Sequence, residues 1–144
     1  MRIVVANGPN LNLLGTREPE IYGTQTLADL EREVTAAAAE LGCETVFFQS
    51  NHEGEIVDRL HAEASSAGGI VINPAALTHY SIALYDCLKA LPVPAVEVHI
   101  SNLFARAEPF RTTSVTARAC VGIISGLGFR GYRLAMEYLL DLDK

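Results

Sequence analysis

Five short apolar runs, separated by stretches with helical spacing, constrain the fold of this chain more than any other feature. The runs are rich in β-branched residues and almost continuously apolar, which is typical of strands in a parallel sheet that is covered on both faces. They extend over Ile3 to Ala6, Thr45 to Gln49, Gly69 to Asn73, Ala95 to His99 and Val121 to Ser125. The chain is therefore expected to alternate between strands and helices.

Helix start and stop signals lie between the runs. Thr26 with Asp29 predicts a capping box, and Gly42 predicts the end of the same helix. Ser50 with Glu53 predicts the start of the second helix. This alternation, with right-handed crossovers, predicts an α/β fold: a flavodoxin-like, doubly wound, five-stranded parallel sheet in the order 2-1-3-4-5, forming a three-layer α/β/α structure.

Two later helices complete the pattern. Thr78 predicts the start of the third helix, which would carry Ile82 on its apolar face. The last helix would bury four large side chains: Leu134, Tyr138, Leu139 and Leu142. No repeat or linker interrupts the 144 residues, which fit a single domain over residues 1–144 and are enough to bury a core.

The charge and hydropathy of the chain narrow its expected partners. Its formal net charge is -6 and it has no run of basic residues, whereas nucleic-acid backbones are bound by clustered Lys and Arg. No apolar tract reaches the length of a membrane span, and the first residues do not form a basic-then-apolar leader. We therefore expect a cytoplasmic protein that acts on a small molecule or another protein, without nucleic-acid or membrane partners.

Several kinds of catalytic site lack their residues in this chain. The cysteines Cys43, Cys87 and Cys120 are odd in number and show no C-x-x-C spacing, so we interpret them as buried thiols, with a nucleophilic role as the weaker alternative. The lysines, Lys89 and Lys144, offer no good Schiff-base candidate. The four histidines are not paired on one helix face, which leaves a metal site open only by convergence of separate loops.

Residues 126–131 read GLGFRG, the G-x-G-x-x-G pattern of dinucleotide-binding proteins. That pattern requires a further strand and an acidic residue about twenty positions later, but the sequence ends thirteen residues after Gly131. We expect these glycines to serve a tight turn and close packing of a helix on the sheet. FMN binding stays open on fold grounds alone.

Polar residues follow three of the predicted strands. These segments are Asn7 to Asn10, Asn73 to Pro74 and His99 to Asn102. In an open α/β sheet, ligands bind beyond the carboxyl ends of the strands, beside the point where the strand order reverses. We therefore expect the three segments to converge on one pocket; the alternative is that each Asn only caps a turn.

Within VEVHISN, Glu97 and His99 are two residues apart on one strand, so their side chains share a face. A buried carboxylate is costly unless it is paired, and a Glu bonded to an imidazole nitrogen fixes the tautomer and favours the imidazolium. The pair predicts either an oriented general acid or a structural ion pair. Directly after it, the backbone N–H groups of Ile100 and Ser101 and the Ser101 hydroxyl are suited to holding a carboxylate.

The connection from Leu11 to Gln25 is long for a loop between a strand and a helix, and such loops are often functional. Arg17 and Tyr22 lie in its middle. A Tyr that acts as a base near neutral pH needs its pKa lowered by about 3 units, part of which a nearby guanidinium supplies. The pair predicts a catalytic base; an equal alternative is that Tyr22 packs under the loop while Arg17 pairs with Glu18 or Glu20.

Together these motifs resemble the type II 3-dehydroquinate dehydratases of the shikimate pathway. The resemblance rests on segments in the correct order: NGPNLNLLGTREPEIYG, FFQSNHEGEIVDRLH, INPAALTHYSIALYD, VEVHISN and GLGFRGY. It implies a lyase that converts 3-dehydroquinate to 3-dehydroshikimate and water by anti elimination through an enolate, for the biosynthesis of chorismate and aromatic amino acids. It also implies that the enzyme needs no metal or cofactor and assembles as a homododecamer built from trimers.

The resemblance also implies the roles of particular residues. Tyr22 would remove the substrate's C2 proton as tyrosinate, Arg17 would lower the pKa of Tyr22, and Asn10 would stabilise the enolate through water. His99, oriented by Glu97, would protonate the departing hydroxyl. Six residues would bind the substrate: Asn73, His79, Asp86, Ile100, Ser101 and Arg111. Of these, Asp86 would reach the site of a neighbouring subunit, and the loop that carries Tyr22 would close over the substrate as a lid.

The chain departs from the family pattern in three places. After HISN it reads LFARAEPFR, with Phe104 in place of the usual His and one extra residue before Arg111, which leaves the register of Arg111 open. The segment TTSVTARACVG lacks the usual His-Ser-Tyr character, and Ala75 stands where Gly is common. A non-catalytic relative that binds a small carboxylate or FMN is therefore one alternative. A receiver-type signalling domain is disfavoured, because Asn7 and Asn73 stand where acidic residues are expected.

Overall fold

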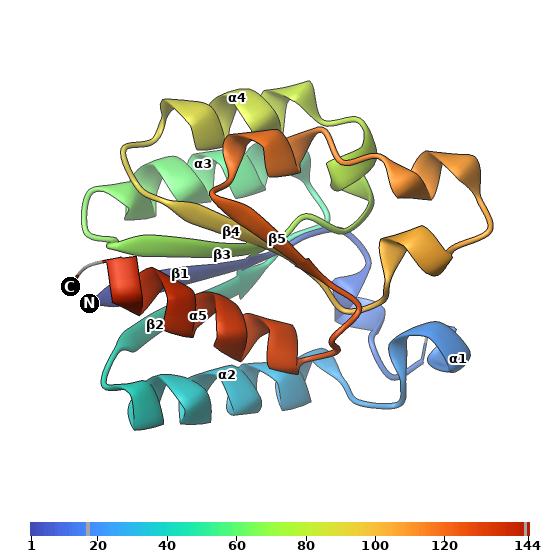
Figure 1. Ribbon diagram of the computed structural model, residues 1–144, viewed down its shortest axis with the longest axis horizontal. Coiled ribbons are helices and arrows are strands. Elements are labelled where there is room, and N and C mark those ends of the chain that lie inside the picture. The colour runs from blue at the N-terminus through green and yellow to red at the C-terminus, as the bar shows by residue number, and fades with distance from the viewer. Residues whose placement is uncertain (17, 143) are drawn as a thin grey trace.

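The predicted strands form one parallel sheet in the predicted order (Figure 1). The computed structural model describes residues 1–16, 18–142 and 144, and it describes Tyr22 by its backbone only. Within that part of the chain the sheet runs β2-β1-β3-β4-β5, and every neighbouring pair is parallel. The strands are β1 (Arg2–Asn7), β2 (Glu44–Gln49), β3 (Gly69–Asn73), β4 (Ala95–His99) and β5 (Gly122–Ser125). Each bound lies within one residue of the prediction.

Helices cover both faces of the sheet, so the three-layer prediction is confirmed. In Figure 1, α2 (Leu27–Leu41) and α5 (Arg130–Leu142) lie on one face, and α3 (Glu53–Ala64) and α4 (Ile82–Ala90) lie on the other. The short α1 (Pro19–Tyr22) precedes α2. Short 3-10 segments occupy the loops: η1 (Leu11–Leu13), η2 (Ala75–His79), η3 (Leu103–Ala105), η4 (Pro109–Thr112) and η5 (Thr116–Ala119).

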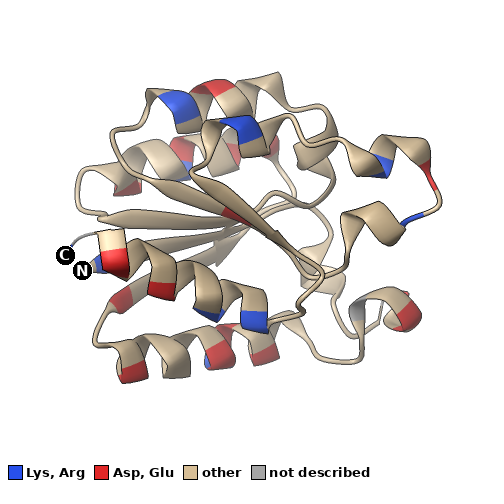
Figure 2. Cartoon of the chain, in the orientation of Figure 1, with Lys and Arg blue, Asp and Glu red and all other residues tan. Residues whose placement is uncertain are grey.

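The core consists of two apolar clusters, one on each face of the sheet. The strands β3 and β4 are buried throughout, and β1 is buried after its first residue, whereas Ile123 on the edge strand β5 is 44% exposed. Charged residues lie mostly on the helices and loops, and the sheet is mostly free of them (Figure 2). None of the described helices is long and apolar enough to cross a membrane.

The start of α2 follows its sequence signals. The Thr26 hydroxyl accepts a hydrogen bond from the Asp29 N–H at 3.2 Å, and the Asp29 carboxylate accepts one from the Thr26 N–H at 2.8 Å. Gly42 ends the helix in a left-handed conformation, with φ of 74°. This capping box satisfies backbone donors that the helix itself leaves free, and the prediction for this helix is confirmed.

The predicted starts of α3 and α4 are wrong. The N-cap of α3 is His52, and the Ser50 hydroxyl instead accepts a hydrogen bond from the His52 N–H at 3.0 Å. The helix α4 begins after Ser81, whose hydroxyl accepts a hydrogen bond from the Leu84 N–H at 3.0 Å. Thr78 lies in η2 and does not cap a helix. Its hydroxyl donates to the buried carboxylate of Glu97 instead, because a hydroxyl that could cap a helix can also bond to a group that is distant in the sequence.

The prediction for the buried faces of the later helices is partly wrong. Leu139 is buried as expected, but Tyr138 is 49% exposed and Leu142 is 50% exposed. Ile82, at the start of α4, is 65% exposed. The buried face of α5 is built from residues in a different helical phase: Gly131, Tyr132, Ala135, Met136 and Leu139.

The glycines of GLGFRG serve a turn and close packing, as predicted. Gly126 and Gly128 have φ of 91° and 60°, which favours glycine. A Cβ on Gly131 would lie 3.1 Å from Cγ1 of Val98 and 3.3 Å from Cγ2 of Ile124. The absence of a side chain at Gly131 therefore brings α5 close to β4 and β5, which sets the depth at which this helix packs on the sheet.

Candidate active site

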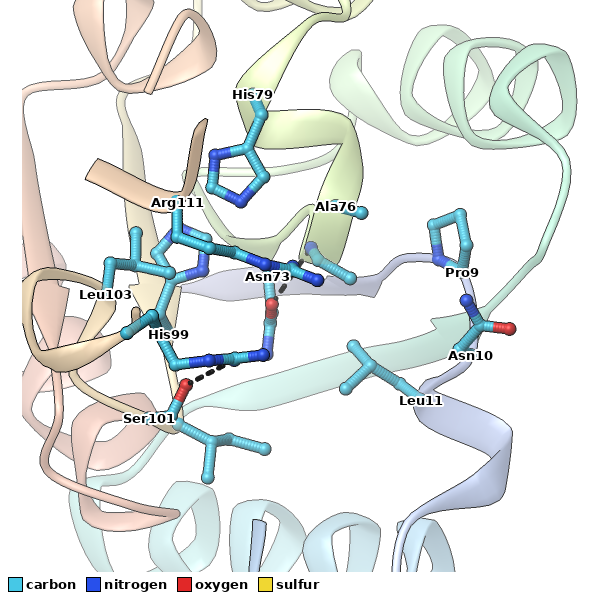
Figure 3. Close-up of a pocket in the computed structure, with 13 residues that line it drawn as sticks. Pro9, Asn10, Leu11, Asn73, Ala76, His79, His99, Ser101, Leu103 and Arg111 are labelled. Carbon is cyan, nitrogen blue, oxygen red and sulfur yellow. Dashed lines mark hydrogen bonds between the residues drawn. The ribbon is translucent and has the colours of Figure 1, made fainter. Parts of the chain in front are cut away.

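The polar segments that follow β1, β3 and β4 line one pocket beyond the carboxyl ends of these strands. Figure 3 shows Pro9, Asn10 and Leu11 on one side of this pocket and His99, Asn73 and Arg111 on the other. The expected site residues that line it are Asn10, Asn73, His79, His99, Ile100, Ser101 and Arg111. The strand order reverses between β1 and β3, so the pocket lies where ligands bind in sheets of this kind.

The side chains of Glu97 and His99 lie together on one face of β4, as their spacing predicts. Nε2 of His99 is 2.6 Å from Oε1 of Glu97, and the two residues are 4% and 0% exposed. The bond to Glu97 places a proton on Nε2 and leaves Nδ1 as the ring nitrogen that can exchange a proton with a molecule in the pocket. The pair therefore has the geometry of an oriented acid.

Hydroxyl groups surround the carboxylate of Glu97. Oε1 accepts hydrogen bonds from Thr78 at 2.5 Å and Ser114 at 2.9 Å, and Oε2 accepts one from Thr116 at 2.6 Å. Burial alone would raise the pKa of Glu97, but the bonds from His99, Thr116 and Thr78 outweigh it, and the pKa lies below its ordinary value. Glu97 is therefore a carboxylate at neutral pH despite its burial.

His79 presents a hydrogen-bond acceptor at the pocket. Its Nδ1 lies 2.8 Å from the carbonyl oxygen of Thr113, so Nδ1 carries the proton, because a carbonyl only accepts. Burial lowers the pKa of His79 despite the bond to Thr113, and the positive charge of Arg111 lowers it further. The ring is thus neutral, and its buried Nε2 has no hydrogen-bond partner among the described residues.

Arg111 lines the pocket, where the resemblance expects it. It belongs to η4, and its guanidinium carbon lies 4.9 Å from the centroid of the Phe110 ring. Nε of Arg111 is buried and has no hydrogen-bond partner among the described residues. A free buried donor therefore stands near the free acceptor of His79.

Arg106 also lines the pocket, and sequence reasoning missed it. Its NH1 lies 3.5 Å from the Ser101 hydroxyl, and its side chain is 9% exposed. The position of Arg106 in the sequence could have indicated it, because this residue follows the segment that ends at Asn102 by four residues. A buried guanidinium also needs anionic or polar groups around it, which a polar pocket provides.

The side chain of Asn73 has structural partners as well as a place in the pocket. Its Nδ2 donates to the Tyr132 hydroxyl at 2.9 Å, and its Oδ1 accepts from the Ala75 N–H at 3.1 Å. The Tyr132 hydroxyl donates in turn to Oδ1 of Asn7 at 2.7 Å. These bonds form a buried floor, and the amide of Asn73 retains one N–H and one lone pair for a ligand.

The described residues that line the pocket do not include three of the expected site residues. Asp86 is exposed on α4 and does not line the pocket of its own chain. Arg17 lies outside the described residues, as does the side chain of Tyr22, which ends α1. The interpretations of this pair as a base and of its loop as a lid therefore stay predictions. Among the described residues, no cluster of His, Cys, Asp and Glu could hold a metal ion.

The doubly wound fold and the buried carboxylate–imidazole pair at its switch point define a class of enzyme that works by acid–base chemistry. Residues 1–140 match the family Dehydroquinase class II, and the chain belongs to this family. It is 55% identical over 144 residues to the 3-dehydroquinate dehydratase of Carboxydothermus hydrogenoformans, covering 100% of this chain and 93% of the relative. It is 56% identical over 141 residues to that of Deinococcus radiodurans, covering 97% and 98%.

Solved structures show the same likeness. The type II dehydroquinase of Butyrivibrio crossotus superimposes with a TM-score of 0.94 at 44% identity, covering 97% of each chain. A TM-score this high over 97% of each chain means that the two proteins share one fold.

Proposed function

We propose that this protein is a lyase that removes water from 3-dehydroquinate and releases 3-dehydroshikimate, a step of the shikimate pathway. The observation that carries the proposal is the buried pair of Glu97 and His99 at a pocket of the predicted kind. The relatives named 3-dehydroquinate dehydratase, which match along the entire chain, support the choice of substrate. The proposed enzyme consists of one domain over residues 1–144, works without metal or cofactor and is cytoplasmic.

The proposed reaction divides the proton transfers between two residues. Tyr22, as tyrosinate beside Arg17, takes the proton from C2, and the electrons of that C–H bond form the enolate at the C3 carbonyl. Asn10 acts on the enolate oxygen through water. The enolate then collapses, the C1–O bond breaks, and His99 gives the departing hydroxyl a proton from Nδ1, so that water leaves.

The charge on Glu97 suits this role of His99. A carboxylate 2.6 Å from Nε2 stabilises the imidazolium that has to be present before the proton is delivered. After delivery, the ring is neutral with its remaining proton on Nε2, still bonded to Glu97. The acid therefore returns to its starting state by taking one proton from water, with no change in the position of the ring.

The free groups of His79 and Arg111 suit a substrate hydroxyl. A hydroxyl can donate to Nε2 of His79 and accept from Nε of Arg111, which would satisfy both buried atoms at once. On the opposite wall, Ile100 and Ser101 are proposed to hold the substrate's carboxylate, and Asn73 offers its remaining amide N–H. Each of these contacts is polar, as a polyhydroxylated acid requires.

We propose that the active form is a homo-oligomer, a dodecamer built from trimers. The exposure of Asp86 on α4 supports this arrangement, because a carboxylate outside its own pocket is free to enter that of a neighbouring subunit. Ile82 and Tyr80, both 65% exposed, lie at the start of the same helix and just before it, and would be covered in such an assembly.

A turnover assay tests the proposed function. Purified protein should convert 3-dehydroquinate to a product with the ultraviolet absorbance of a conjugated enone, in buffer with a chelator and no added cofactor. His99→Ala should lower kcat by at least about 100-fold. The matched control is His61→Ala, since His61 is exposed on α3 and should leave kcat unchanged. No turnover by the wild type, or full turnover by His99→Ala, would refute the proposal.

Tyr22→Phe tests the base separately from the acid. Removal of the hydroxyl should abolish most turnover, because no other group is assigned to the C2 proton. Exchange of the C2 hydrogen with solvent deuterium, followed by NMR, should disappear in Tyr22→Phe. Tyr138→Phe, at an exposed position of α5, is the control.

A further inference from the structure

Three hydroxyl groups from two separate segments converge on one buried carboxylate. Thr78 comes from η2, whereas Ser114 lies just before η5 and Thr116 is its first residue. Thr78 and Thr116 are fully buried, as is Glu97, to which all three residues are bonded. A buried carboxylate needs a partner, and His99 already provides one for Glu97. Three further donors are therefore more than burial of this Glu requires.

The protons of this cluster are arranged for an ionised Glu97. Each hydroxyl has one proton to give. Thr78 and Ser114, whose oxygens are 2.6 Å apart, both give their protons to Oε1. Thr116 donates to Oε2, and His99 donates to Oε1. A protonated Glu97 would have to reverse one of these bonds, so the cluster selects the carboxylate.

We propose that Thr78, Ser114 and Thr116 are positioning residues for the acid: their hydroxyls keep Glu97 a carboxylate, fixed against Nε2 of His99, so that Nδ1 faces the pocket. The inference rests on the proposed function. The three residues do not belong to the pocket wall as the described residues form it, so they act on the reaction through Glu97. They also join the loop that carries Arg106 and Arg111 to the strand that carries the acid.

The ionisable groups around Glu97 determine whether its protonation can be observed in a pH profile. His99 faces it from β4, His79 from η2 and Cys120 from the end of η5, while the charge of Arg111, on η4, acts on His79. Burial, and then the charge of Glu97, raise the pKa of Cys120 to about 12, so this thiol stays neutral below that pH. The proposed base Tyr22 has to be a tyrosinate, so its protonation also lowers kcat/KM on the acid side of the pH profile. The protonation of Glu97 is a separate step on that side, because the pKa of Glu97 lies below its ordinary value, and the protonation of His79 is another.

Thr116→Val tests the inference, because valine has the shape of threonine without the hydroxyl. The lost donor lets Glu97 take up a proton at higher pH, so the Glu97 step on the acid side of the kcat/KM profile should move upward by about one pH unit, while the Tyr22 step stays in place. At the optimum, kcat should fall about tenfold, while KM for 3-dehydroquinate stays within about twofold of the wild type. Thr116→Ser keeps the hydroxyl and should restore both the Glu97 step and kcat.

A second readout does not depend on turnover. In nitrogen-15 NMR spectra, His99 of the wild type should have its proton on Nε2 in the neutral form, and Thr116→Val should move the mixture of tautomers toward Nδ1–H. If Thr116→Val does not fold, Thr78→Val with Thr78→Ser as its control provides the same comparison. Each pair is measured in the complete chain under identical buffers.

The outcomes separate this inference from the proposed function. A wild type without turnover defeats the proposed function. An active wild type whose Glu97 step and His99 tautomer are unchanged in both valine variants defeats the positioning role. A serine variant that loses as much kcat as the valine variant also defeats it, because that result assigns the effect to packing.

Discussion

Oδ1 of Asn51 accepts a hydrogen bond of 2.9 Å from the backbone N–H of Asn10. The same oxygen accepts one from Nε2 of Gln49, also at 2.9 Å, and that Nε2 donates to the Gly8 carbonyl at 3.1 Å. Asn10 has a φ of 70°, in the left-handed region, which Asn adopts more readily than most residues with a side chain. The loop after β2 therefore holds the loop after β1 in the conformation that brings Asn10 to the pocket.

Asn51→Ala should release this loop. We expect kcat to fall about tenfold, equivalent to about 1.4 kcal/mol, because Asn10 would no longer be held where the enolate forms. Stopped assays at saturating 3-dehydroquinate would measure the change. Asn51→Asp keeps an acceptor at the same place and should retain most activity. Equal activity of Asn51→Ala and the wild type would show that Asn10 needs no such support.

Tyr132→Phe should destabilise the fold. Removal of the hydroxyl leaves Oδ1 of Asn7 and Nδ2 of Asn73 without their buried partner, at a cost of about 1–3 kcal/mol in the free energy of unfolding. Urea denaturation followed by circular dichroism would measure it. Burial raises the pKa of Tyr132, so the loss should not vary between pH 6 and pH 9. Tyr138→Phe is the exposed control, and an equal loss in both variants would contradict the role of the floor.

Ala75→Gly should stabilise the fold. Ala75 has a φ of 51°, in the left-handed region, where a Cβ costs about 1 kcal/mol that glycine avoids. Part of this gain is offset by the greater freedom of glycine in the unfolded chain, so an increase of up to about 1 kcal/mol is expected. Ala76→Gly, one residue later and outside that region, should instead destabilise by roughly 0.5–1 kcal/mol. Thermal unfolding of the two variants should shift in opposite directions.

The stability of the wild type should fall as the solution is acidified through the titration of His79. The pKa of His79 in the fold lies below the ordinary 6.5, so the unfolded chain binds more protons between the two values. The free energy of unfolding therefore rises with pH across that window and declines as pH drops below about 6.5. His79→Gln should lack this part of the decline. Urea unfolding between pH 5 and pH 7.5 would measure the difference, and identical slopes would exclude it.

A second decline should come from Glu97 at lower pH. Its pKa in the fold is also lowered, but from 4.5, so its contribution is present above about 4.5 and is lost as pH falls further. The free energy of unfolding should therefore decline in two separate pH ranges. If His79→Gln removes only the decline at higher pH, that decline is assigned to His79 and the one at lower pH to Glu97.

The sheet was predictable because its signal lies in the sequence itself. Each apolar run matches a strand within one residue, since strands buried on both faces have to be apolar along their length. The capping box of Thr26 was predictable because it is local. The predictions that Thr78 and Ser50 cap helices were wrong for one reason, which is that each hydroxyl has another hydrogen-bond partner. The partner of Thr78 is Glu97, 19 residues away, and the partner of Ser50 is the His52 N–H. The prediction that Tyr138 is buried was wrong because helical spacing alone does not determine which face of a helix packs on the sheet.

The site was predictable where chemistry and spacing coincide. Glu97 and His99 share a face because alternate residues of a strand do, and the resemblance assigned His79 and Arg111 to a pocket in which both lie. The hydroxyls of Ser114 and Thr116 could not be predicted, because serine and threonine are common in loops and the contact with Glu97 depends on the path of a long connection. Arg106 was missed for the same reason.

The floor of the pocket joins Asn7 to Tyr132, residues 125 positions apart in the sequence. A ribosome delivers β1 and β3 before α5, so the amide of Asn73 lacks its hydrogen-bond partner, the Tyr132 hydroxyl, until α5 has emerged and docked. The hydrogen bonds among Asn7, Asn73 and Tyr132 therefore form only after α5 has been synthesised. A nascent chain that already has all of β1, β3 and β4 would still lack a finished binding site, which ties the appearance of catalytic competence to completion of the fold.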